Sequence, residues 1–186
     1  GKFNLDGDGQ ADLENHGGEH KAVYAYSLDH YPYFRDALGR DEMPFGQFGE
    51  NFTVSGLDET RSYLGDHLKI GSACFAITQP RVPCFKLGLR FGDPKLPKLF
   101  SRSLRTGFYL KVLREGFVQA GDEVEVTQRG YGEVRIDRLY EALIRPKGRD
   151  VAAILARALE VAELAPEWRA AIHERLGEVV PAGTRP

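Results

Sequence analysis

Short apolar stretches separated by glycine-containing turns recur between residues 20 and 130. The clearest share one pattern, Gly-Asp-x-hydrophobic-x-hydrophobic, which occurs at residues 65–70 and again at 121–126. Alternation with a period of two is typical of a strand with one buried face. Short strands with turn signals at this spacing predict a barrel or curled sheet. The other strand-like stretches are residues 22–26, 52–54, 73–78 and 107–113.

Helical periodicity takes over after about residue 134. Apolar residues at helical spacing predict one helix near residues 136–144 with Asp137 as N-cap, a second after Asp150, and a third that Pro166 opens. A short helix is also expected from Asp29 to Leu38. The predicted fold is therefore mainly β, a β-barrel with a few short helices followed by a C-terminal three-helix module.

These patterns divide the chain into three parts. We expect a β-barrel domain over residues 1–133, the three-helix module over residues 134–180, and a tail over residues 181–186. The chain begins at Gly1 in what looks like the middle of a motif, so an upstream piece is expected to be missing.

The composition is that of an ordinary globular protein and excludes several classes. The formal net charge of the 186 residues is -2, which argues against nucleic acid and acidic membranes as partners. No apolar run approaches the roughly 20 residues of a membrane span. Two cysteines make no disulfide framework, so a reducing, cytoplasmic setting is expected. Cys74 lies in an apolar run and is predicted to belong to the core.

One segment, residues 79–87, carries the strongest chemical signal. It holds Cys84 between stiffening prolines, with Arg81, Lys86 and then Arg90 close by. Nearby cations favour the reactive thiolate, and a thiolate binds soft metals. The segment indicates an anchor for an anionic, metal-bearing ligand. The alternative, a half-buried structural cysteine, stays open.

Two glycine-containing loops could also contribute to binding an anionic ligand. Paired glycines within residues 16–21 let backbone N–H groups approach an anion, and Lys21 follows them. In the loop at residues 46–51, Glu50 and Asn51 either orient a ligand by hydrogen bonds or merely cap the loop.

Three other motifs are rejected because the sequence departs from the residues that each of them requires. Acidic residues alternate over residues 6–14, but the glycine and glutamate required in a calcium-binding EF-hand loop are missing. A Gly-x-Gly start at residues 7–9 lacks both the third glycine and the preceding strand of a dinucleotide fingerprint. His16 and His20 have the spacing of a zinc helix, but two glycines lie between them.

Taken together, the ordered motifs resemble the MOSC domain, named after the C-terminal domain of molybdenum cofactor sulfurase. The likeness is greatest to the small bacterial YiiM-like branch, whose C-terminal "3-alpha" appendage the three predicted helices resemble. Two departures stand out: Leu104 occupies a position where the resemblance calls for glycine, and no opening strand precedes Gly1. The motifs that carry the resemblance lie at residues 16–24, 48–51, 65–66, 79–87 and 107–113.

The resemblance implies a β-barrel-like fold that binds molybdenum cofactor (molybdopterin), with Cys84 as the metal ligand. It also implies a molybdenum-dependent oxidoreductase. Such an enzyme reduces small N-hydroxylated compounds, for example 6-hydroxylaminopurine, with electrons from a partner, an electron-donor reductase. On this hypothesis Cys84 is the catalytic and metal-binding residue, and His16 or Glu50 donates a proton. The residues expected to hold the cofactor are Lys21, Asn51, Arg81, Lys86 and Arg90.

Two alternatives remain open. In one, the domain carries sulfur or the cofactor without turnover of its own, and Cys84 holds a persulfide or hands the cofactor over. In the other, the three-helix module is the functional end of a binding or scaffold protein. A homodimer is compatible with the sequence, which does not fix the oligomeric state. The module's basic edge consists of Arg135, Arg138, Arg145, Lys147 and Arg149.

Overall fold

The structure is a computed structural model that describes residues 1–2, 18–146 and 150–177. Within those residues one mixed sheet has six strands in the order β2-β1-β5-β4-β3-β6. β1 and β2 run parallel, and every other neighbouring pair is antiparallel. The predicted strands are confirmed. They are β1 (Val23–Ser27), β2 (Phe52–Val54), β3 (His67–Ile70), β4 (Ala73–Pro80), β5 (Phe108–Arg114) and β6 (Val124–Gln128).

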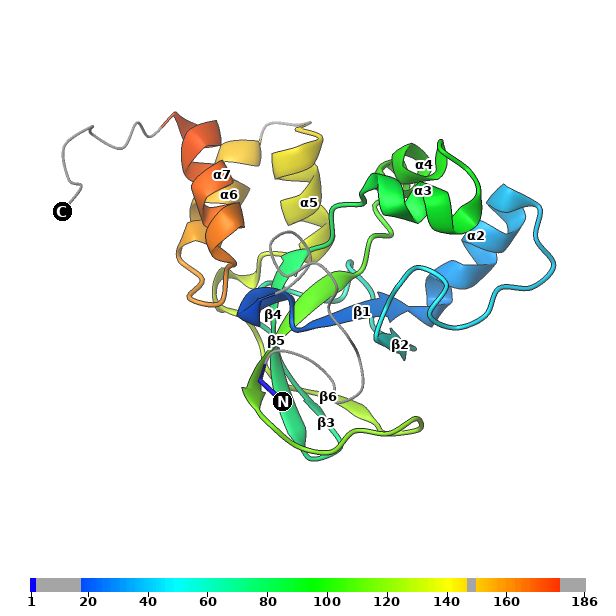
Figure 1. The fold of residues 1–186 in the computed structure, drawn as a ribbon. Coiled ribbons are helices and arrows are strands. Elements are labelled where there is room, and N and C mark those ends of the chain that lie inside the picture. Colours follow the sequence, from blue (N-terminus) through cyan, green and yellow to red (C-terminus); the bar gives the residue numbers. More distant parts are fainter. Residues whose placement is uncertain (3–17, 147–149, 178–186) are drawn as a thin grey trace.

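The sheet curls into a half-barrel, which confirms the predicted barrel-like fold (Figure 1). Its pairing register shifts at Cys74/Phe75 and at Ile77/Gln79 between β4 and β5, and at His67/Leu68 between β3 and β6. Such irregularities bend a strand and increase its twist. They account for curvature in the part of the sheet from which the Cys84 segment leaves.

The predicted helices are present with small corrections. The helix expected to end at Leu38 stops there, and Gly39 follows in the left-handed conformation with φ of 60°. Asp137 is not an N-cap: Arg135 takes that position, and the Asp137 carboxylate accepts from Arg135 Nε at 2.9 Å. The helices are α2 (Tyr31–Leu38), α3 (Phe85–Phe91), α4 (Leu96–Ser103), α5 (Ile136–Ile144), α6 (Val151–Leu159) and α7 (Pro166–Leu176). Of these, α3 and α4 were not predicted.

β1 separates two hydrophobic clusters. Its five residues are all buried, and the two faces of the strand belong to different clusters. Val23 and Ala25 pack into a cluster shared by the sheet and the C-terminal helices. Tyr24 and Tyr26 pack into an aromatic cluster that β1 shares with α2, α3 and α4. Because side chains alternate across a strand, this one segment aligns both helical groups relative to the sheet.

The two helical groups lie on opposite sides of this strand. In Figure 1, α5, α6 and α7 stand together at the upper left, and α2, α3 and α4 at the upper right. The C-terminal helices join the sheet core through the fully buried side chains of Tyr140, Leu155 and Ile172.

The prediction that Cys74 belongs to the core is wrong, because Cys74 is partly exposed. No helix among the described residues is long and apolar enough to cross a bilayer.

Candidate functional site

The Cys84 segment continues directly from β4. The pairing with β5 extends past Pro80, because the backbone N–H of Arg81 donates to the carbonyl of Gly107 at 3.1 Å. The chain then turns into α3, for which Cys84 is the N-cap residue in an extended conformation, with φ of -113° and ψ of 174°. The Cys84 side chain is partly exposed. The cysteine therefore stands at the junction between the sheet and the α3–α4 pair.

Arg81 places a fixed positive charge next to this junction. Its Nη1 donates to the carbonyl of Phe48 at 2.7 Å, and its guanidinium carbon lies 4.5 Å from the ring centroid of Tyr24 and 5.6 Å from that of Phe100. Burial lowers the pKa of Arg81. The neighbouring Tyr24, Tyr109 and Cys84, which are negative when deprotonated, raise it by more, so the pKa is raised overall. The arginine thus stays charged and is held on three sides.

Tyr109 on β5 lies beside Tyr24, the tyrosine whose ring Arg81 covers. It is the register partner of Tyr24 on β1, with the two ring centroids 5.3 Å apart. Burial raises the pKa of Tyr109, against the opposing effect of Arg81 and Lys21, while Cys84 and Glu167 raise it further. The pKa of Tyr109 is therefore affected by Arg81, Lys21, Cys84 and Glu167 together. Sequence reasoning assigned this tyrosine no role, although its place in a predicted strand beside β1 was a usable signal.

Lys21 reaches the site from the segment before β1, where it meets α7. Its Nζ lies 2.7 Å from Glu167 Oε1. The start of α7 is held there because the Ala165 N–H donates to the Thr78 carbonyl on β4 at 3.2 Å. Burial raises the pKa of Glu167, but hydrogen bonding and attraction to Lys21, together with His20, lower it overall. Glu167 was missed from the sequence, since no local motif marks it.

Glu50 is buried and organises its own loop. Its two carboxylate oxygens accept hydrogen bonds from four donors, which hold residues 46–53 in one shape. This geometry agrees with the loop-capping alternative, and the role of Glu50 as proton donor stays a prediction. The donors are Gly46 N at 3.1 Å, Phe48 N at 3.0 Å, Thr53 Oγ1 at 3.1 Å and the Tyr31 hydroxyl.

Asn51 fastens the same loop to β1. Its Oδ1 accepts from the Tyr24 N–H at 2.7 Å, and its own N–H donates to the Tyr24 carbonyl at 2.9 Å. The loop thereby brings the Phe48 carbonyl to Arg81. Asn51 thus supports the site through its two hydrogen bonds to Tyr24. Its contact with the cofactor stays a prediction.

The remaining predicted residues lie further out. Lys86 and Arg90 are exposed on α3, and the Arg90 side chain passes beside Gly49. His16 lies outside the described residues, as do the motifs at 6–14 and 7–9 and the tail. The arrangement therefore brings together Cys84, Arg81 and Lys21, with Lys86 and Arg90 at the rim.

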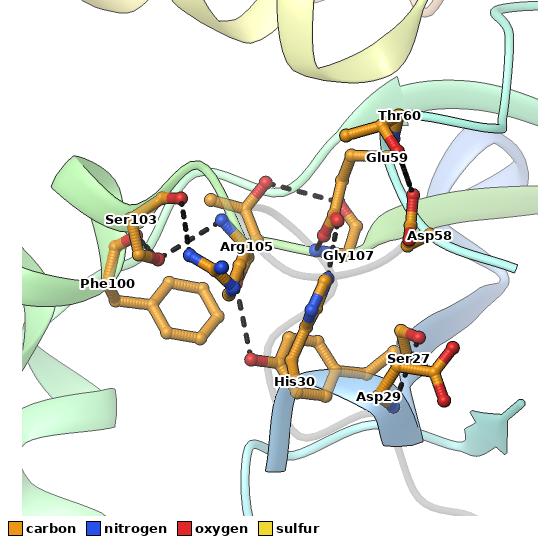
Figure 2. A network of polar contacts seen from close by, with 12 residues as sticks. Ser27, Asp29, His30, Asp58, Glu59, Thr60, Phe100, Ser103, Arg105 and Gly107 are labelled. Atoms are coloured by element: carbon orange, nitrogen blue, oxygen red, sulfur yellow. Dashed lines mark hydrogen bonds and ion pairs between the residues drawn. The ribbon is translucent and has the colours of Figure 1, made fainter. Parts of the chain in front are cut away.

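A buried hydrogen-bond network of His30 and Glu59 contacts Gly107 (Figure 2). His30 Nε2 lies 2.6 Å from Glu59 Oε2, and Glu59 Oε1 accepts from the Gly107 N–H. The His30 and Glu59 side chains are almost completely buried. Because the Gly107 carbonyl accepts from the Arg81 N–H, the pair helps to fix the exit of β4. Nothing in the sequence motifs indicated this network.

A separate hollow of about 470 Å³, lined by both charged and apolar side chains, lies between α5, α6 and the segment around Val134. Its charged side chains carry both signs. Arg138 Nη1 is 3.2 Å from Glu141 Oε2, so two of its charges already pair with each other. The hollow includes neither Cys84 nor Arg81, and we assign the candidate site to the Cys84 junction instead.

Fold and site together define a small half-barrel protein that presents a partly exposed cysteine beside a half-buried arginine. A model of the MOSC domain matches residues 12–125, and the chain belongs to the MOSC domain family. The predicted family is confirmed.

Comparison with known proteins agrees with this assignment. The chain is 36% identical over 178 residues to the uncharacterized protein YflK of Bacillus subtilis (strain 168), covering 96% of this chain and 79% of YflK. It superposes on the crystal structure of YiiM from Geobacillus stearothermophilus with a TM-score of 0.81 and 34% identity, covering 86% of this chain and 80% of that one. It is also 34% identical over 119 residues to a reductase of Gibberella moniliformis, covering 62% of this chain but only 21% of that protein. The similarity to YiiM confirms the predicted branch.

Proposed function

We propose that this chain binds molybdenum cofactor, with the Cys84 sulfur as ligand to the metal, and reduces N-hydroxylated compounds. The observation that carries the proposal is the partly exposed Cys84 beside the half-buried, permanently charged Arg81. Membership of the MOSC family and the similarity to a protein called a reductase support it.

The donor set fits a metal that arrives with its own ligands. Among the described residues there is no group of three or more His, Cys, Asp or Glu side chains able to hold a metal ion. A lone thiolate suits a metal already chelated by a pterin, since it supplies one soft ligand and leaves the other positions to the cofactor. When bound, the cofactor supplies a metal centre that exchanges electron pairs with a substrate.

The protein's part is placement and charge. Arg81 presents a rigid fork suited to phosphate or pterin oxygens, while Lys21 offers a compact charge from the segment before β1. Lys86 and Arg90, both exposed on α3, extend the positive field outward from the Cys84 junction. Lys21 is shared with Glu167, so an anionic group at this position competes with that carboxylate.

The proposed reaction is a two-electron reduction at nitrogen. In a hydroxylamino compound such as 6-hydroxylaminopurine, the N–O bond breaks, and two electrons and two protons convert R–NHOH into R–NH₂ and water. An electron-donor protein supplies the electrons. His16 and Glu50 are the proposed proton donors; the four hydrogen bonds that Glu50 accepts agree better with a supporting role for that residue.

Molybdenum content tests the ligand assignment. The protein is produced in a host that makes the cofactor, and molybdenum per chain is measured after purification. Cys84→Ala is expected to lose the metal, whereas Cys74→Ala, which removes the other partly exposed thiol, is expected to keep it. Equal retention in both variants would contradict the proposal.

Turnover separates the enzyme from the carrier alternative. The loaded protein is expected to convert 6-hydroxylaminopurine to adenine when a chemical reductant supplies electrons. A carrier would retain the cofactor, show no such turnover, and transfer it to an apo-enzyme.

A further inference from the structure

An exposed apolar stripe begins immediately beside Cys84. Val82, Phe85 and Leu89 are 46%, 70% and 73% exposed, although each is a large hydrophobic residue. Phe85 and Leu89 are four residues apart on α3 and so lie on one side of that helix. The opposite side of α3 is buried through Leu87 and Phe91. The residues of the stripe therefore do not take part in the hydrophobic core.

The same helix pair carries an unusual excess of positive charge. Residues 81–107 contain seven lysines and arginines but one carboxylate, Asp93, in a chain of net charge -2. The Asp93 side chain accepts from the Lys95 N–H at 2.8 Å and is used at the start of α4. The exposed cations of the two helices are Lys86, Arg90, Lys95, Lys98 and Arg102.

α3 and α4 are neighbours in the fold. They pack directly against each other, with Gly88 allowing close approach: a Cβ there would meet the Asp93 carbonyl at 2.9 Å. In Figure 1 the two helices lie side by side at the upper right, apart from α5–α7 at the upper left. We call the exposed residues of these two helices, together with Val82, the α3–α4 face.

We infer that the α3–α4 face is the docking surface for an acidic electron-donor protein, an inference that rests on the proposed function. An apolar centre with a charged rim is the usual anatomy of a protein interface, and a one-signed rim steers an oppositely charged partner. Cys84 is the residue before α3, so a donor seated on the stripe approaches the proposed metal ligand closely. The exposed Phe85 and Leu89 favour a protein over a nucleic acid, which would leave them against phosphates.

The test measures docking separately from turnover. The probes are a reduced flavodoxin and a reduced [2Fe–2S] ferredoxin, both acidic one-electron carriers, so that two donor molecules serve one substrate. Binding to the full chain is measured by isothermal titration and NMR at low and high salt. Leu89→Ser and the double variant Lys95→Glu/Lys98→Glu alter the face without touching the residues proposed to hold the cofactor. Arg157→Glu, an exposed charge reversal on α6, is the control.

At least one probe is expected to bind, about tenfold more weakly in the double variant and in Leu89→Ser than in the unmodified protein or the control. The difference made by the double variant should shrink at high salt. The KM for that donor should rise by a similar factor, while kcat with reduced methyl viologen stays unchanged. Unfolding temperatures check that each variant is folded.

Three outcomes would overturn the inference. They are unchanged binding in both variants, no binding of either probe, or loss in the variants of binding to phosphatidylserine vesicles with no effect on the protein probes. Docking that persists in Cys84→Ala, together with absence of molybdenum from the unmodified protein, would leave the docking surface standing and reject the proposed function.

Discussion

Lys21 Nζ lies 2.7 Å from Glu167 Oε1, and this ion pair joins the segment before β1 to the first turn of α7. The two residues are 146 positions apart in the chain. Lys21 is largely buried and Glu167 about half exposed. The contact makes the C-terminal helices part of the candidate site's edge rather than a distant appendage.

Replacing Glu167 by Gln should lower stability at neutral pH and leave it nearly unchanged in acid. The pKa of Glu167 is lowered in the fold, so its contribution is present above the ordinary value of 4.5 and is lost as the pH falls through the folded pKa. For so exposed a pair the contribution is about 0.5 kcal/mol, or roughly 1–2 °C in Tm.

Thermal unfolding from pH 3.5 to 7.5 measures this difference. Glu174→Gln, at an exposed carboxylate of the same helix, serves as the control and should show little change at any pH. A difference for Glu167→Gln that stays constant across the range would mean that Lys21 is not its cause.

Gly107→Ala should destabilise the protein far more than a glycine substitution with the same backbone conformation elsewhere. Gly107 has φ of 68°, and a Cβ there would lie 2.5 Å from the Ala25 carbonyl oxygen and 2.7 Å from Tyr24 Cε2. Gly39 has φ of 60° with open space around it, so Gly39→Ala costs only the backbone strain, about 1 kcal/mol. For Gly107→Ala we expect the unfolding free energy, measured by urea denaturation, to fall by about 3 kcal/mol or more. Similar losses in Gly107→Ala and Gly39→Ala would refute the steric argument.

The regular elements could be predicted because their signals are local. Glycine-bounded alternation marked the strands, and the stripes that follow Asp150 and Pro166 marked the last two helices. α3 was missed because Phe85 and Leu89 are apolar yet exposed and Gly88 lies in the middle of the helix, so no amphipathic pattern is visible. α4 had a usable signal, Pro97 in its first turn.

Leu104, which departs from the family pattern, keeps a backbone conformation that is typical of glycine. The resemblance calls for glycine there, and the structure gives Leu104 a φ of 59°, in the left-handed region at the end of α4. The backbone thus keeps the conformation that favours glycine. The leucine side chain packs against the sheet core, which offsets part of the strain.

The site was only partly predictable for a different reason. Cys84 and Arg81 share one short motif, so their proximity follows from the sequence. Tyr109 and Glu167 reach the same place through strand pairing and helix docking, which no local pattern reports. Glu59 belongs to none of the sequence motifs, and only the fold shows that it is buried.

Glu59→Ala should be among the most damaging single substitutions outside the hydrophobic core. It removes the acceptor for both His30 Nε2 and the Gly107 N–H, and both donors are buried (Figure 2). Breaking a buried pair in this way costs about 3–5 kcal/mol. Asp29→Ala is the matched control: its exposed carboxylate accepts one backbone hydrogen bond, from Gly56 at 3.1 Å, and its loss costs about 1 kcal/mol.

Chemical denaturation of the two variants measures both costs. Equal, small losses would show that water or a neighbouring group replaces the Glu59 carboxylate, and that the pair does not hold Gly107.

Arg81→Lys should impair the site even though it keeps the charge. A lysine has no fork, so it cannot hold the Phe48 carbonyl while lying 4.5 Å above the Tyr24 ring. We expect a loss of about 1–3 kcal/mol in unfolding free energy, from a part-buried charge-assisted hydrogen bond, and reduced molybdenum per purified chain. Arg105→Lys removes a comparable stacking contact, 4.3 Å from the Tyr33 ring centroid, at a residue that is not among those proposed to hold the cofactor, and should leave the metal content unchanged. Full molybdenum content in Arg81→Lys would show that charge alone suffices at this position, and the argument from the fixed fork would fail.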